Sequence, residues 1–127
     1  MEYTFTKIQI RYRDLDTVGH VNNAVYFSYF EQGRIDFIKK YLFEFRADDV
    51  NFVLARAEAD FYRSIKLDDE IYVKTFISKV GKKSFDMSYE ITDSSGNLYS
   101  RGKTVNVFIK NEKPIEVPEF IRHFAEI

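Results

Sequence analysis

The residues best suited to chemistry gather between residues 13 and 26. This stretch holds two carboxylates, Asp14 and Asp16, one of the two histidines of the chain, His20, and two adjacent asparagines shortly after it. A carboxylate can act as a base or a nucleophile, and a histidine can transfer protons near neutral pH. A purely structural connection rarely concentrates so many functional groups, so this stretch is the first candidate for an active site.

A strand and a long helix must position these groups. Residues 5–13 alternate between two faces, which predicts a strand with one buried face. Gly19 predicts a break in periodicity, and either Asn22 or Asn23 can cap a helix. A mostly apolar stripe at three- and four-residue steps then predicts a helix to about Tyr41, on the basis of Phe27, Phe30, Arg34, Phe37, Ile38 and Tyr41. The first turn of such a helix has unpaired amides and a partial positive charge, which favour an anion.

The rest of the chain is typical of β-structure. Alternating patterns predict strands at residues 53–62, 71–78, 85–92 and 98–109, and short turns between the later ones favour antiparallel neighbours. In the first of these strands an alanine-lined face, from Val53 to Phe61, predicts that the long helix packs closely over it. A short closing helix is expected at Glu119–Phe124, after Pro118. The sequence therefore predicts a single α+β domain, residues 1–127, with one long helix against an antiparallel sheet.

Composition limits the function classes. The formal net charge of −1 gives no electrostatic case for nucleic acid or an anionic membrane. The chain has no cysteine, so a thiol nucleophile and a disulfide are excluded. It lacks a signal peptide and an apolar run of about 20 residues, so we expect a cytoplasmic protein. The 17% of aromatic residues favours packing between subunits.

The residues of the first stretch match a known pattern at fixed spacings. Asp14–Gly19 reads Asp-Leu-Asp-Thr-Val-Gly, His20–Tyr26 reads His-Val-Asn-Asn-Ala-Val-Tyr, and Phe30–Arg34 reads Phe-Glu-Gln-Gly-Arg. Together they resemble the signature of hotdog-fold acyl-CoA thioesterases, in the branch similar to 4-hydroxybenzoyl-CoA thioesterase. Weaker likenesses continue through Leu67–Glu70 and a hairpin at Gly96, so the resemblance covers nearly the whole chain.

The resemblance implies a fold and an assembly. The hotdog fold has a long central helix wrapped by an antiparallel sheet of five or more strands. Its members form homodimers with active sites shared at the dimer interface, and these often pair into homotetramers.

The resemblance also implies catalytic roles. Asp16 matches the catalytic carboxylate, and it could attack the thioester or act as a base on water. The backbone N–H of Asn23 is the expected oxyanion donor at the helix start. His20 could orient the thioester or hold the loop, although some relatives carry a histidine at the position of Asn23 instead. Glu31 is the alternative carboxylate, but Arg34 one turn later favours an ion pair between them.

Substrate contacts are expected from two parts of the chain, the loop before the long helix and the cations of the later strands and turns. We expect Gly19, Asn22 and Tyr26 to contact the substrate around the loop. The cations that could reach the phosphates of CoA are Arg56, Arg63, Lys82, Lys83, Arg101 and Lys103, and Ser84 lies in the same turn as Lys82 and Lys83. Asp14 is expected to position the loop.

The sequence therefore predicts an acyl-CoA thioesterase that needs no metal or organic cofactor. Two alternatives stay open, a non-catalytic acyl-CoA-binding hotdog protein and a thioesterase for acyl groups on acyl carrier protein. A hotdog dehydratase is less favoured, because the chain lacks the glycine- and proline-rich segment of those branches and contains only two prolines.

Overall fold

The structure is a computed structural model that describes residues 2–42 and 50–125. A short 3-10 turn precedes the long helix α1, and a π-helical turn extends it. In chain order the elements are β1 (Tyr3–Ile8), the 3-10 turn (Tyr12–Asp14), α1 (Asn23–Phe37), the π-helical turn (Ile38–Leu42), β2 (Val50–Phe61), β3 (Ile71–Val80), β4 (Ser84–Thr92), β5 (Leu98–Lys110), β6 (Lys113–Pro114) and α2 (Glu119–Arg122).

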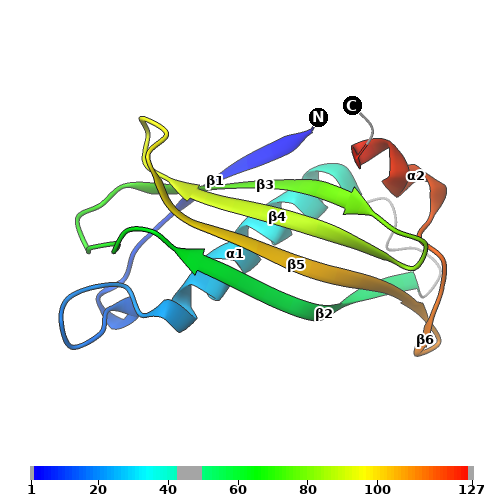
Figure 1. Ribbon diagram of the computed structural model, residues 1–127, viewed down its shortest axis with the longest axis horizontal. Coiled ribbons are helices and arrows are strands. Elements are labelled where there is room, and N and C mark those ends of the chain that lie inside the picture. Colours follow the sequence, from blue (N-terminus) through cyan, green and yellow to red (C-terminus); the bar gives the residue numbers. More distant parts are fainter. Residues whose placement is uncertain (1, 43–49, 126–127) are drawn as a thin grey trace.

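The strands form one antiparallel sheet in the order β1-β3-β4-β5-β2, with the short β6 paired to β5. Helix α1 lies across one face of this sheet, as Figure 1 shows. The α+β architecture and the long helix agree with the sequence prediction. Neither α-helix of the described residues is long and apolar enough to cross a membrane.

The core lies between α1 and the inner face of the sheet. Strand β4 buries every second residue, as its alternation predicted: Phe85, Met87, Tyr89 and Ile91. The helix contributes Tyr26, Phe30 and Phe37, whereas Phe27 keeps 38% of its surface exposed. The predicted apolar stripe is therefore correct at Phe30 and Phe37 and wrong at Phe27, and the buried face also includes Tyr29 and Gly33.

Two glycines allow α1 to approach the sheet closely. A Cβ atom on Gly33 would collide with Oγ1 of Thr75, and one on Gly102 would collide with the ring of Phe30. That ring also stacks on Tyr89, with the ring centroids 5.1 Å apart. Close approach of the backbones is thus built into both the helix and β5.

Strand β2 contains an irregularity that the sequence pattern did not reveal. Its pairing with β5 shifts between Leu54 and Arg56, which leaves Ala55 as an extra residue. Before this bulge Leu54 pairs with the buried Asn106, and after it Ala57 pairs with the buried Thr104. Residues that pair across strands share a face, so the bulge moves Val53 and Ala55 away from the helix side. The prediction of one continuous alanine face was wrong for this reason.

Strand β1 is also shorter than predicted. Its last residue, Ile8, pairs with Ile71, which is the first residue of β3. Beyond that point β3 offers no further backbone groups, so the alternating residues up to Arg13 leave the sheet and enter the 3-10 turn. A segment with alternating apolar residues does not form a strand unless a neighbouring strand pairs with it.

We expect Gly102→Ala to lower the free energy of unfolding by about 1–3 kcal/mol, because the added methyl group meets the ring of Phe30. Urea unfolding followed by circular dichroism measures this loss. Adding Phe30→Leu to Gly102→Ala should recover part of the stability, and Gly81→Ala, with its nearest contact at 3.4 Å, serves as the control. An unchanged stability in Gly102→Ala would show that the helix can move away from the sheet at little cost.

Candidate active site

The loop before α1 is organised by the side chain of Asp16. Its Oδ1 accepts hydrogen bonds from the backbone N–H groups of Val18 (2.9 Å) and His20 (3.1 Å). The backbone N–H of Asp16 donates to the carbonyl oxygen of His20 over 2.7 Å, and Gly19 turns the chain with a φ of 81°. The other carboxylate oxygen, Oδ2, accepts no hydrogen bond from the described residues. One oxygen of Asp16 therefore holds the loop while the other stays available for chemistry.

Among the described residues, the start of α1 leaves the backbone N–H of Asn23 without a partner. Asn22 is the N-cap, and its Oδ1 accepts from the N–H of Ala24 over 2.9 Å. The N–H of Val25 donates to the carbonyl oxygen of Asn22, and the N–H of Asn22 donates to that of Asp14. The N–H of Asn23 has no partner within residues 2–42 and 50–125. This leaves one backbone donor at the positive end of the helix, seven residues after Asp16.

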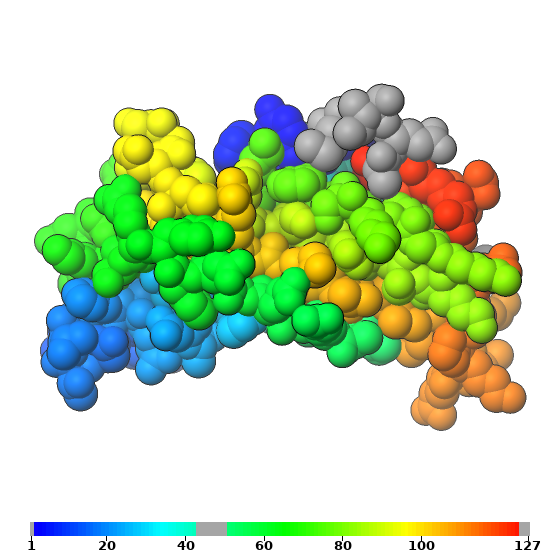
Figure 2. Space-filling view, in the orientation of Figure 1, coloured from blue at the N-terminus to red at the C-terminus, as the bar shows by residue number. Residues whose placement is uncertain are grey.

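A cavity of about 190 Å³ opens beside this loop. The predicted residues Asp16, His20, Asn23 and Tyr26 line it, together with Val21. Its opposite wall comes from the end of β2 and the turn after it, Phe61–Ser64. Figure 2 shows these two parts of the chain side by side, blue and green, at one end of the molecule. Backbone pairing of His20 with Lys66 joins them.

Two tyrosines fix the loop from within the core. Tyr29 donates to Oδ2 of Asp14 over 2.7 Å, and that oxygen also accepts the N–H of Arg11. Burial and the Asp14 carboxylate raise the pKa of Tyr29 above its ordinary value, so it stays protonated as a donor. Burial also raises the pKa of Tyr26, whose hydroxyl points to the carbonyl oxygen of Arg63. Asp14 has the positioning role that the sequence predicted.

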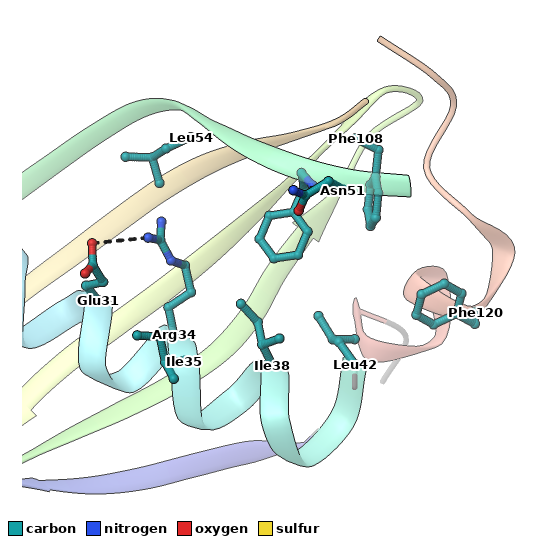
Figure 3. A pocket seen from close by; sticks show the side chains of 10 residues that line it. Glu31, Arg34, Ile35, Ile38, Leu42, Asn51, Leu54, Phe108 and Phe120 are labelled. Carbon is teal, nitrogen blue, oxygen red and sulfur yellow. Dashed lines mark hydrogen bonds and ion pairs between the residues drawn. The ribbon is translucent and has the colours of Figure 1, made fainter. Parts of the chain in front are cut away.

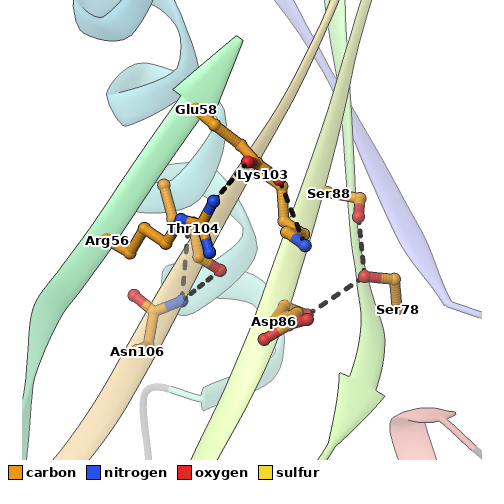
Figure 4. Close-up of polar contacts among 8 residues, drawn as sticks. All are labelled: Arg56, Glu58, Ser78, Asp86, Ser88, Lys103, Thr104 and Asn106. Carbon is orange, nitrogen blue, oxygen red and sulfur yellow. Dashed lines mark hydrogen bonds and ion pairs between the residues drawn. The ribbon is translucent and has the colours of Figure 1, made fainter.

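The structure does not bring all predicted substrate residues to this cavity. Arg56 lies in the middle of β2 and pairs with Glu58 over 3.1 Å, and Glu58 also pairs with Lys103. Figure 4 shows this group on the face of the sheet. The turn with Lys82, Lys83 and Ser84 lies at the other end of the sheet, because Ser84 pairs with Val107 and Val107 with Val53, near the start of β2.

Sequence reasoning did not place the opposite wall of the cavity. Tyr62 and Ser64 follow a strand without any local sign of function, and Arg63 was one of several scattered cations. In the structure Arg63 is exposed, lines the cavity, and has its guanidinium 4.5 Å from the ring centroid of Tyr99. A basic residue directly after an aromatic strand end is the only signal that could have indicated it.

A larger cavity of about 390 Å³ lies toward the other end of β2. It runs between the C-terminal half of α1 and the first residues of β2, as Figure 3 shows. Apolar side chains form most of its wall, and Glu31 and Arg34 form a polar point in it through an ion pair of 3.5 Å. The remaining lining residues are Ile35, Ile38, Leu42, Asn51, Phe52, Leu54, Phe108 and Phe120.

The described part of the chain contains no cluster of side chains that could bind a metal ion. Those residues contain no group of three or more His, Asp or Glu side chains arranged to hold an ion. The groups at the Asp16 cavity that could take part in chemistry are a carboxylate, a helix amide and an imidazole.

A long helix that packs on a curled antiparallel sheet is the arrangement of the hotdog fold. The family model of the thioesterase-like superfamily matches residues 10–124. The chain therefore belongs to the thioesterase-like superfamily, and the predicted hotdog fold and thioester hydrolase class are confirmed.

Three individual proteins illustrate the similarity. The uncharacterized protein YsmA of Bacillus subtilis is 33% identical over 110 residues, which cover 85% of this chain and 74% of YsmA. The acyl-CoA thioester hydrolase YbgC of Escherichia coli O6:H1 is 24% identical over 90% of this chain and 89% of its own. A crystal structure of a thioesterase of Thermus thermophilus, complexed with coenzyme A and Zn, is 35% identical, with a TM-score of 0.81 over 95% of this chain and 90% of that one.

We expect Asn22→Ala to destabilise the protein by about 1 kcal/mol, because the N–H of Ala24 loses its cap. Thermal and urea unfolding measure the change. Asn22→Asp keeps the acceptor and should stay close to the parent. If both variants unfold alike, the cap contributes nothing to the stability of the loop.

Proposed function

We propose that this protein hydrolyses acyl-CoA thioesters to a free acid and CoA, with Asp16 as the reacting carboxylate. The observation that carries this proposal is the unpaired Oδ2 of Asp16 in the same cavity as the unpaired N–H of Asn23, among the described residues. A thioester carbonyl between them would have the carboxylate beside its carbon and the amide beside its oxygen. Either attack by Asp16 or activation of a water by Asp16 fits this arrangement.

The remaining groups support the same reaction. The developing oxyanion would accept a hydrogen bond from the N–H of Asn23. The partial positive charge of the helix start would strengthen this hydrogen bond. The departing thiolate needs no strong acid, because the pKa of a thiol is about 8.5. His20 lines the cavity and would orient the thioester or the water. Gly19, Asn22 and Tyr26 would shape the approach of the pantetheine arm.

We further propose that the active protein is at least a homodimer joined through β2. This strand is at the end of the sheet order, and no strand of the described residues pairs with its outer edge. Six large apolar side chains on β2, the residue after it and the neighbouring side of α1 are 38% to 52% exposed: Phe27, Ile35, Val53, Leu54, Phe61 and Tyr62. A long apolar edge strand of this kind is covered in stable proteins. A second copy of the same edge fits it by two-fold symmetry.

Such a dimer would complete the active site. Antiparallel pairing of two β2 strands places the end of one beside the start of the other. The Asp16 cavity lies at the end of β2, at Phe61, and the larger apolar cavity lies at its start, at Phe52. The apolar cavity of each protomer would then lie beside the Asp16 cavity of the partner, where it would receive the acyl group.

The same symmetry would bring the distant cations to the substrate. Lys82, Lys83 and Ser84 lie at the start of β2 in their own protomer, and hence on the side of the partner's Asp16. We propose that this turn reaches the phosphates of CoA across the interface. Arg56, in the middle of β2, would lie nearer the centre of that interface. Association of dimers into a homotetramer and a cytoplasmic location are further proposals.

Incubating the protein with aliphatic and aromatic acyl-CoAs should release free thiol, measured with a chromogenic thiol reagent. In Asp16→Asn the loop acceptor Oδ1 is retained, whereas the reacting carboxylate is lost. We expect the rate of thiol release to fall at least about a hundredfold.

The matched control is Asp86→Asn, which makes the same change on the outer face of the sheet and should keep the parent rate. Equal rates in Asp16→Asn and the parent would move the reacting role to Glu31. Tight binding of acyl-CoA without thiol release would identify a non-catalytic binding protein.

Light scattering coupled to size exclusion should give the mass of a dimer or tetramer for the parent. We expect Val53→Glu to shift it towards the monomer, because two charges would meet at the paired edge. Leu67→Glu alters a side chain of similar exposure, 41% against 46%, away from β2 and should leave the mass unchanged. A monomeric parent that still hydrolyses acyl-CoA would rule out the shared site.

A further inference from the structure

Arg34 is a partly buried cation in a mostly apolar cavity. Its side chain is only 19% exposed, and it lines the 390 Å³ cavity beside Ile38 and Leu54. A guanidinium carries five N–H donors. The single polar contact of this one, within the described residues, is Oε2 of Glu31 at 3.5 Å. A partly buried cation with most of its donors unbonded is suited to an oxygen of a ligand.

Glu31 limits which oxygen this can be. Its carboxylate side chain is 61% exposed and lines the same cavity, so an anionic group of a ligand would meet its negative charge as well as Arg34. A hydroxyl group suits both partners, because its oxygen accepts from the guanidinium while its hydrogen donates to the carboxylate. Asn51 is the third polar residue of the lining, and because its Oδ1 accepts the N–H of Phe52, its Nδ2 is the group that would face a ligand oxygen.

The rest of the cavity specifies the body of the ligand. Ile38, Leu42 and Phe108 supply an apolar wall beside the Arg34–Glu31 pair, as Figure 3 shows. Phe52 also lines this wall. Binding pockets commonly combine an apolar wall with a few polar groups that fix orientation. The cavity is thus suited to an apolar acyl group that carries a hydroxyl substituent.

We infer that Arg34, with Glu31, is a specificity-determining residue that selects hydroxylated acyl groups, and that it serves the substrate cleaved at Asp16 of the partner protomer. This inference rests on the proposed function and on the proposed dimer, which place the apolar cavity of one protomer beside the Asp16 cavity of the other. Within one protomer the two cavities lie at opposite ends of β2.

Binding can be measured without turnover. On the Asp16→Asn protein, calorimetry compares octanoyl-CoA with its 3-hydroxy and 8-hydroxy derivatives and with the CoA thioester of octanedioic acid. We expect at least one hydroxylated ligand to bind about tenfold or more tightly than octanoyl-CoA, as one charge-assisted hydrogen bond provides. In Asp16→Asn with Arg34→Met this preference should disappear, while binding of octanoyl-CoA stays similar.

Arg101→Met in the same background is the matched control. Arg101 also forms an ion pair with a glutamate, Glu90, over 3.4 Å, but it does not line the cavity. It should keep the preference for the hydroxyl group. Equal binding of all ligands before Arg34 is changed overturns the inference, and so does tighter binding of the dicarboxylic ligand.

A mixed dimer tests the action across the interface. One protomer carries Asp16→Asn and the other Arg34→Met, with different tags for purification of the mixed species. If Arg34 acts on the partner's site, the only intact Asp16 faces an intact Arg34, and hydrolysis keeps the hydroxyl preference of the parent. If it acts within its own chain, the mixed dimer loses the preference and this part is overturned.

The proposed hydrolysis and the proposed role of Arg34 can be overturned separately. Selective binding without thiol release from any acyl-CoA overturns the proposed hydrolysis but leaves the role of Arg34 intact. Thiol release with no preference for a hydroxyl group overturns the role of Arg34 and leaves the proposed hydrolysis intact.

Discussion

The close approach of α1 to the sheet sets the positions of the other elements. Gly33 and Gly102 remove the two Cβ atoms that would hold the backbones apart, and the ring of Phe30 fills the space above Gly102 and stacks on Tyr89. The helix lies along the sheet, with its N-terminus at one end and its C-terminal half at the other (Figure 1). Residues of α1 line both cavities.

At the N-terminal end, hydrogen bonds of the loop decide which groups remain for chemistry. The N–H groups of Asn22, Ala24 and Val25 all have partners, whereas that of Asn23 has none in the described chain. Asp16 divides its two oxygens in the same way, one for the loop and one for the cavity. A single carboxylate thus has both the structural role of a turn aspartate and the availability that a catalytic role requires.

At the edge of the sheet, β2 links the geometry of the fold to the assembly. Its inner side is interrupted by the bulge at Ala55, and its outer edge is unpaired within the described residues. Near its middle, Arg56 and Glu58 of β2 form an ion pair on the sheet face, and Glu58 also pairs with Lys103 of the neighbouring β5 (Figure 4). The exposed apolar residues instead lie at both ends of the strand and on the adjacent helix, where a second copy would cover them.

The sequence by itself determined the features that depend on neighbours within about four residues. The turn around Gly19, a helix cap at Asn22 or Asn23 and the buried alternation of β4 could be predicted, because each follows from local hydrogen bonds or from a regular period. Only the tertiary structure decided that β1 ends at Ile8, that β2 contains a bulge, and that Tyr62 to Ser64 form a wall of the Asp16 cavity. These features depend on contacts between segments far apart in the chain, and no local pattern encodes such contacts.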